Sequence, residues 1–299
     1  MIHQNILRFR NGRYAWWALG LTVLSVIIYA TQGGRERPGG GTWQGYALGT
    51  LGALLIVWLA LLGIRKRSYR STLGSVQGWT SAHVWLGLAL VLIATLHCAG
   101  LFGWNVHTLA YALMCLVIVS GIFGVYVYLS MPRQLSANTG GLSRAALFAE
   151  LFGLDRQGRE LARACDPAIG NAVRSSIERT SLGGGVLRQL LAIDRSLFMR
   201  TDADADHARA STSVVRNPDQ QAVIDYVARR VPQAAKRAEA ATLQALMVLL
   251  SRRQAVLRRI RRDIQLQGWL QLWLYIHVPL TIALIVALIV HILTTFMYW

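Results

Sequence analysis

Four of the seven histidines lie inside long apolar stretches, where ionisable residues are rare and usually functional. They form two pairs with the same spacing of 14 residues, His83 with His97 and His277 with His291. In an α-helix, 14 steps come within about 40° of four full turns and rise about 21 Å. Both members of a pair therefore share one helix face, with one member near each side of a bilayer's hydrocarbon core. Imidazole nitrogens in these positions can ligate a metal ion or a haem iron.

The apolar stretches indicate the class of protein. Only 15% of the 299 residues are charged, and residues 71–132 and 264–299 contain no Asp, Glu, Lys or Arg. Soluble proteins carry about 25% charged residues. This composition excludes an ordinary soluble enzyme, a disordered chain and a disulfide scaffold, and it predicts an integral membrane protein. The chain has no CxxC pair, which excludes covalent haem attachment through such a pair. Its three cysteines are also too few for an iron–sulfur cluster held by four cysteines of this chain.

Five stretches are long enough to cross a bilayer as helices, which takes about 20 residues. We place them at 14–31, 44–64, 79–101, 107–130 and 268–298. Pro132 is expected to stop the fourth helix. The predicted fold is an all-α integral membrane protein with transmembrane helices one to four in 1–131, a helical cytoplasmic domain in 132–267, and the fifth transmembrane helix in 268–299.

The inserted domain is expected to consist of short helices and one linker. Breaks between helices are predicted at Asp166-Pro167 and at Gly183–Gly185. Residues 201–217 have the composition of a mobile linker. From about Pro218 a helical pattern runs on, and it can continue directly into the fifth membrane helix.

The distribution of Lys and Arg predicts the orientation. Basic residues gather in the N-terminal arm, in the second loop, and in the segment 131–267, which carries 22 basic and 13 acidic residues. The positive-inside rule then places the N-terminus and the inserted domain in the cytoplasm, and the C-terminus in the periplasm, of a protein of the bacterial inner membrane. The net charge of +17 reflects this asymmetry, and nothing in the sequence supports a nucleic-acid partner.

The two histidine pairs are expected to lie at matching depths. The third and fifth helices both run from the cytoplasmic side outwards, so His83 is level with His277, and His97 is level with His291. Each level can hold one haem iron between two imidazoles in a four-helix bundle. The alternative is that the histidines only form hydrogen bonds between packed helices.

The motifs His83-x13-His97 and His277-x13-His291 resemble those of the membrane dihaem cytochromes b. That group includes the cytochrome b of quinol–cytochrome c oxidoreductases, bacterial dihaem cytochromes b and the membrane domain of ferric reductases and NADPH oxidases. The stretch His277-Val-Pro-Leu to Ile-Val-His291 is especially similar to a ligand helix of cytochrome b. The resemblance covers 79–130 and 268–298 only. It implies two non-covalent b haems and electron transfer across the membrane.

Further residues are candidates for contacts with the haem propionates. Arg65, Arg67 and Arg70 stand on the cytoplasmic side, where they also serve as topology signals. His107 begins the fourth helix at the outer side. It can bind a propionate, relay a proton at a quinone site, replace His97 as a ligand, or simply lie at the membrane interface.

The expected function is electron transfer within a larger redox complex. The chain has no flavin or nicotinamide fingerprint, so electrons must come from a membrane quinol or a cytoplasmic carrier and pass to a periplasmic carrier such as a c-type cytochrome. The alternatives are a stand-alone quinol-dependent or metal-reducing reductase, and a non-redox membrane protein. The arginine run 252–262 can bind anionic lipid, dock an acidic partner or mark topology.

Overall fold

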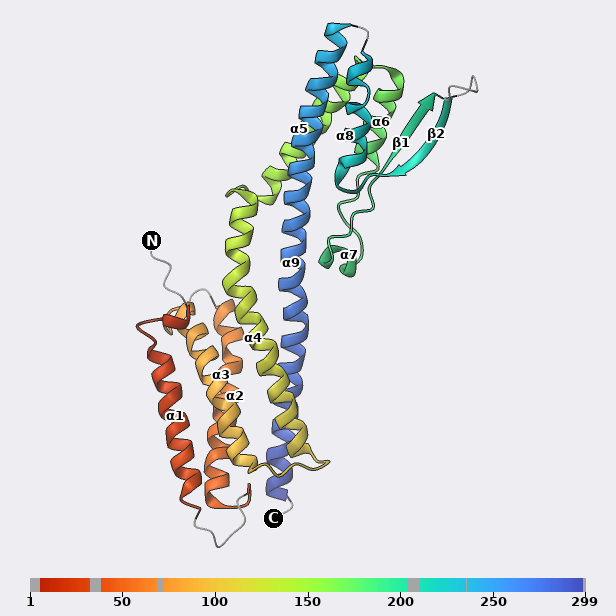
Figure 1. The fold of residues 1–299 in the computed structure, drawn as a ribbon. Helices are drawn as coiled ribbons and strands as arrows, with labels where there is room; N and C mark the ends of the chain where they lie inside the picture. Colours follow the sequence, from red (N-terminus) through yellow and green to blue (C-terminus); the bar gives the residue numbers. More distant parts are fainter. Residues whose placement is uncertain (1–5, 33–38, 69–71, 204–209, 235, 298–299) are drawn as a thin grey trace. The chain divides into compact units, whose positions relative to one another are not determined.

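A computed structural model describes residues 6–32, 39–68, 72–203, 210–234 and 236–297 (Figure 1). Of the described residues, 79% are helical. It divides into two compact units, Met1–Val127 with Leu272–Trp299, and Tyr128–Gln271. Two helices, α4 (Val106–Thr139) and α9 (Arg237–Met297), contribute to both units.

The first unit contains the helices expected to cross the membrane. They are α1 (Arg13–Ala30), α2 (Trp43–Arg67), α3 (Val76–Cys98), and the adjoining parts of α4 and α9; a short 3-10 helix, η1 (Ile6–Arg8), precedes them. The five helices are long and apolar enough to span a bilayer, as predicted. Thr42 and Ser75 begin α2 and α3 by accepting hydrogen bonds from Gly45 N and Gly78 N, as N-cap residues do.

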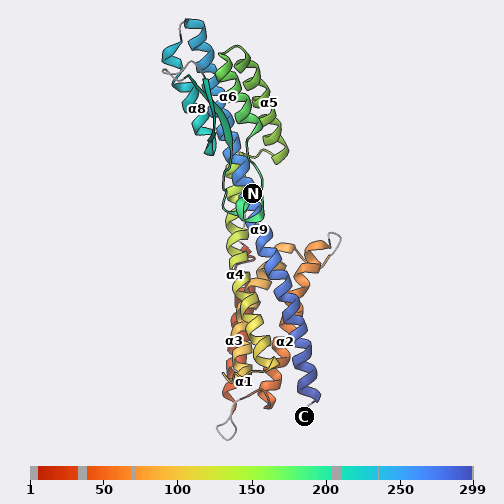
Figure 2. The same ribbon diagram turned by 90° about the vertical axis from the view of Figure 1, so that its right-hand side faces the viewer.

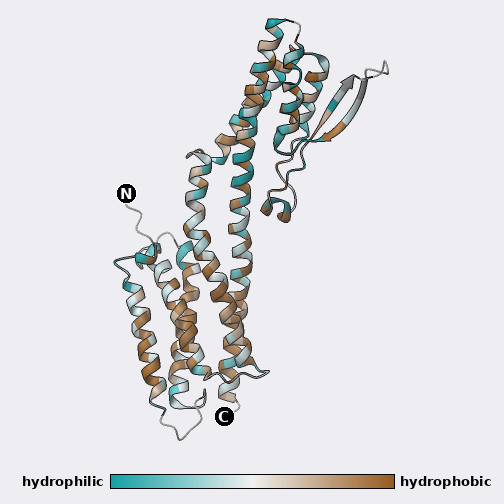
Figure 3. Ribbon diagram, in the orientation of Figure 1, coloured by the Kyte–Doolittle hydropathy of each residue, from teal (hydrophilic) through white to brown (hydrophobic). Residues whose placement is uncertain are grey.

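Large apolar side chains cover the outside of these helices. Trp16 is 70% exposed, Leu54 64%, Val119 64% and Ile282 58%. Figure 3 shows the same helices as predominantly hydrophobic. Such surfaces are stable in lipid and not in water, so the chain is a multi-pass membrane protein by length and composition.

Successive helices of the first unit run in opposite directions (Figures 1 and 2). Hence α1, α3 and α9 are parallel, and α2 and α4 run the other way. The buried apolar core includes Leu48 of α2, Ile93 of α3, Met114 of α4 and Leu284 of α9. This alternation puts both histidine-bearing helices, α3 and α9, in the same direction.

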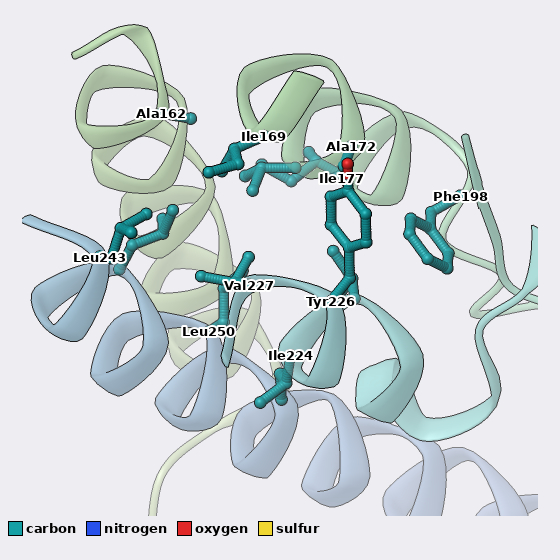
Figure 4. Close-up of a cluster of buried hydrophobic side chains, with 13 residues drawn as sticks. Ala162, Ile169, Ala172, Ile177, Phe198, Ile224, Tyr226, Val227, Leu243 and Leu250 are labelled. Carbon is teal, nitrogen blue, oxygen red and sulfur yellow. The ribbon is translucent and has the colours of Figure 1, made fainter. Parts of the chain in front are cut away.

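The second unit is built mainly from helices, with one hairpin. Its elements are α5 (Arg144–Arg163), α6 (Pro167–Glu178), α7 (Val186–Leu190), β1 (Leu197–Ala203), β2 (Ala210–Arg216), η2 (Pro218–Gln220), α8 (Gln221–Ala228), η3 (Val231–Gln233) and the first half of α9. The predicted breaks are confirmed, since Asp166 caps α6 by accepting from Ala168 N and Gly183–Gly185 lie between helices. Figure 4 shows the buried apolar core of this unit, in which Phe198 lies beside Tyr226 and Leu243 of α9 lies at the other side of the cluster.

The linker expected at 201–217 is wrong where the chain is described, because 201–203 and 210–216 belong to strands, and the purely α-helical class is wrong for this segment as well; residues 204–209 of the expected linker lie outside the described residues. β1 and β2 pair antiparallel, from Leu197 opposite Arg216 to Ala203 opposite Ala210. Neighbouring helices hold the hairpin: Met199 N donates to Ser175 Oγ, and Tyr226 Oη donates to Thr201 O. These tertiary contacts are remote in sequence, which is why local composition did not reveal the strands.

The stop predicted at Pro132 is also wrong, because α4 remains helical to Thr139. A proline removes one backbone hydrogen bond and does not by itself end a helix that is held elsewhere. Two contacts with α9 hold the last turns. Gln134 Oε1 accepts from Arg262 Nη2 at 2.8 Å, and Asn138 Nδ2 donates to Arg259 O at 2.7 Å.

The arginine run on α9 has a structural role within the second unit. Arg253, only 1% exposed, binds Asp155 of α5 at 2.5 Å, and Arg261 binds Asp194 at 2.8 Å. Arg252 pairs with Glu150, and Arg258 pairs with Asp219. These guanidinium groups thus form ion pairs between α9 and other elements of the second unit, a role that differs from the expected binding of lipid or of an acidic partner.

Candidate functional site

Three histidines from three helices gather at one end of the first unit. His97 lies in the last turn of α3, His107 in the first turn of α4, and His291 near the end of α9. One nitrogen from each ring lies within 4.8 Å of the other two. The ring centres are 6.2 Å apart for His97 and His291, 5.3 Å for His97 and His107, and 4.9 Å for His107 and His291. We call these residues the outer cluster.

The backbone of α2 orients the ring of His97. Its Nδ1 donates to the Gly45 carbonyl at 2.7 Å, and because a carbonyl can only accept, the neutral ring carries its proton on Nδ1. The lone pair is then on Nε2. A Cβ at Gly49 would lie 2.6 Å from His97 Cε1, so the helices approach this closely only because residue 49 is a glycine.

The inner pair, His83 and His277, is held in a similar way by other partners. His83 Nδ1 donates to the Leu59 carbonyl of α2 at 3.0 Å. His277 Nδ1 lies 2.7 Å from Ser120 Oγ, whose hydroxyl donates to the Val117 carbonyl, so the serine oxygen accepts from the imidazole. Both rings therefore have Nε2 as the nitrogen able to bind a metal.

An indole and a glycine complete the surroundings of His277. The Trp273 ring centre is 5.5 Å from that of His277, and its Nε1 donates to the Ser120 carbonyl. A Cβ at Gly121 would lie 3.6 Å from His277 Cε1. Sequence reasoning missed Trp273 and Ser120, although Trp273 stands four residues before His277 and thus on the same helix face.

The two levels differ in the number of imidazoles. Within the described residues, the outer cluster is the one group of three or more histidine, cysteine or acidic side chains placed to share a metal ion. The α3–α4 hairpin creates it, because the chain reverses between Cys98 and Val106 and brings His107 level with His97. From the sequence, each expected role of His107 was that of a single residue, and its place in a three-histidine cluster was not predicted.

The spacing of the outer cluster can be compared with the needs of a haem. Two imidazoles that share one iron through bonds of about 2 Å have ring centres about 6 Å apart. His97 and His291, at 6.2 Å, match this separation. The His107 ring lies close to both rings, with its centre 5.3 Å from that of His97 and 4.9 Å from that of His291, so it would have to move aside for a haem to be held between them.

The three arginines predicted to contact haem propionates differ in their surroundings. Arg65 donates to the carbonyls of Ser68 and Gly74 and so ties down the loop after α2. Arg67 is exposed at the end of α2. Arg70 lies outside the described residues.

A basic groove of about 300 Å³ lies between α5 and α6 of the second unit. Arg159, Arg163 and Arg174 line it together with Glu178, and all four side chains are exposed. Three guanidinium groups and one carboxylate around one hollow give the groove a net positive charge.

The likeness to membrane dihaem cytochromes b rests on the histidines themselves. No protein-family model, no curated protein and no solved structure matches this chain.

Proposed function

We propose that this protein carries electrons across a membrane through two b-type haems. His83 and His277 would ligate the haem nearer the cytoplasm, and His97 and His291 the haem nearer the periplasm. The observation that carries the proposal is the common orientation of the ligands. In His83, His97 and His277, a hydrogen bond from Nδ1 to a neighbouring helix leaves Nε2 as the ligand atom, which is the usual arrangement of metal-binding histidines.

Each residue then has a defined task. The four imidazoles would hold the two haem irons, two imidazoles for each, and the hydrogen bonds to Leu59, Gly45 and Ser120 would hold three of the rings in place. Gly49 leaves room for the ring of His97, since a Cβ there would lie 2.6 Å from Cε1. The apolar helices exclude water. When bound, each haem supplies reversible one-electron chemistry at its iron.

The surroundings support a place in a larger redox complex. We propose that the N-terminus and 132–267 face the cytoplasm of a bacterial inner membrane, with the C-terminus in the periplasm, as the positive-inside rule indicates. A membrane quinol or a cytoplasmic carrier would donate electrons, and a periplasmic carrier such as a c-type cytochrome would accept them. The arginine groove offers an acidic cytoplasmic carrier a surface of opposite charge.

Electron transfer through the bilayer can be measured directly. The full chain, loaded with haem, is placed in lipid vesicles that enclose ferricyanide, and dithionite is added outside. We expect ferricyanide reduction with the wild type, and the rate of empty vesicles with His83→Ala or with His97→Ala. A wild-type rate equal to that of empty vesicles contradicts the proposal. Reduction of the haems by a quinol analogue without any partner would assign a stand-alone reductase instead of a subunit.

A further inference from the structure

The outer cluster contains one imidazole more than a bis-histidine haem uses. His97, His107 and His291 come from α3, α4 and α9, and each pair of ring centres is separated by 4.9 to 6.2 Å. The ligand nitrogens lie within 4.8 Å of one another. Three imidazoles that converge from separate helices can supply three ligands to one metal ion. Packing between helices alone does not require them to converge.

The donor set favours a transition metal. Residues 71–132 and 264–299, which supply all three histidines, contain no carboxylate. Nitrogen ligands suit Zn²⁺, Cu²⁺ and Ni²⁺, whereas Mg²⁺ and Ca²⁺ need oxygen ligands. Three histidines with a fourth position open to water or a further ligand are a recurrent zinc arrangement.

The geometry needs only a small adjustment to close around an ion. Tetrahedral coordination with metal–nitrogen bonds of about 2.0–2.1 Å puts the nitrogens about 3.3 Å apart. Side-chain rotation can supply the difference from the present separation of up to 4.8 Å. The Gly45 carbonyl already fixes the ring of His97, so one of the three ligands is oriented in advance.

An ion can reach the cluster. All three rings are partly exposed, and they lie near the ends of α3 and α9 and the beginning of α4. The connecting segment at Leu101, Phe102 and Trp104 is exposed and carries no charge that would repel a cation.

We propose that the outer cluster binds one divalent transition-metal ion, Zn²⁺ being the probe of choice, when no haem occupies that position. Haem and ion exclude each other, because both would use His97 and His291. The ion site needs no haem, whereas the exclusion rests on the proposed function. His107 then distinguishes the two kinds of binding, since the ion needs its imidazole and the haem does not.

The test uses the full chain purified from cells grown with and without a haem precursor. Zinc bound per chain is measured by elemental analysis after equilibration at a series of Zn²⁺ concentrations, and haem is measured on the same samples. We expect one Zn²⁺ per haem-poor chain and little in the haem-loaded chain. His107→Ala should weaken zinc binding at least about tenfold, the minimum loss expected when even an orienting partner of a ligand is removed.

Matched variants separate the outcomes. His97→Ala should lose both zinc and one haem, His107→Ala should lose zinc and keep both haems, and His83→Ala at the inner level should keep zinc. If His107→Ala binds zinc as the wild type does, the inference is wrong, and it is equally wrong if the haem-poor wild type binds none. Circular dichroism of each variant verifies that the helices remain folded. Zinc binding without any haem binding would refute the proposed electron transfer through haems and leave the inferred ion site standing.

Discussion

The inner and outer histidine levels of the membrane unit begin from the same sequence pattern and end in different surroundings. At both levels a carbonyl of α2 fixes the α3 histidine, Leu59 for His83 and Gly45 for His97. The inner His277 is then held by Ser120, with Trp273 beside it. The outer level has a third imidazole, that of His107, where the inner level has Ser120 and Trp273.

This difference shows what a spacing rule can and cannot predict. The 14-residue repeat specifies which histidines share a helix face, and it applies equally to both levels. The neighbours come from α4, which carries a serine at one level and a histidine at the other. The two levels should therefore respond differently to the same kind of substitution.

Loss of a ligand should have the largest effect. If the proposed function is right, His83→Ala and His97→Ala should each remove one haem of two, since a haem iron that loses one of its two imidazoles is weakly retained. Pyridine haemochrome assays on the purified variants measure this, with His107→Ala as the matched control that keeps both haems. Loss of both haems in either single variant would show that the two levels do not bind independently.

Removal of an orienting partner should come next and should affect only the inner level. Ser120→Ala deletes the oxygen that accepts from His277 Nδ1 and should weaken haem retention there about 10- to 100-fold. Haem transfer to excess apomyoglobin follows the two levels as separate kinetic phases. The outer level should release its haem as in the wild type, because the Gly45 carbonyl of His97 is backbone and is not altered. A slowed or unchanged inner phase would contradict the assigned role of Ser120.

Crowding by one methyl group should have the smallest effect and should be confined to the outer level. A Cβ at position 49 meets the His97 ring at 2.6 Å, so Gly49→Ala should destabilise the outer haem by about 1–2 kcal/mol. Gly52→Ala on the same helix is the control, since its Cβ meets only Leu90 Cδ1, at 3.7 Å. Thermal release of haem, followed at the Soret band, compares the two variants, and equal curves would contradict the close approach of α2 to His97.

The sequence allowed the membrane unit to be predicted better than the inserted unit. Lipid demands long uncharged helices, so all five apolar helices could be found from composition. Two of them continue past the predicted ends, α4 to Thr139 and α9 from Arg237. The parallel course of α3 and α9 followed from counting helices. The position of His107 beside His97 and His291 did not follow, because it depends on how tightly the α3–α4 hairpin turns.

The inserted unit depends on contacts that composition does not show. Asp166 signalled a helix start because capping is local. The hairpin β1–β2 is stabilised by Ser175 and Tyr226, which are far from it in the sequence and lie on helices packed beside it. The arginines of α9 looked like a surface charge run, yet Arg253 is buried against Asp155. Pairing between residues about one hundred positions apart cannot be read from either segment alone.

The central claim is that the four membrane histidines hold two haems. The most direct measurement is the haem content per chain of the purified wild-type protein, obtained from the pyridine haemochrome together with a dithionite-reduced minus oxidised spectrum. We expect two b-type haems per chain. A chain that contains no haem after growth in haem-replete cells would contradict it, and the histidines would then serve helix packing or the binding of an ion at the outer cluster.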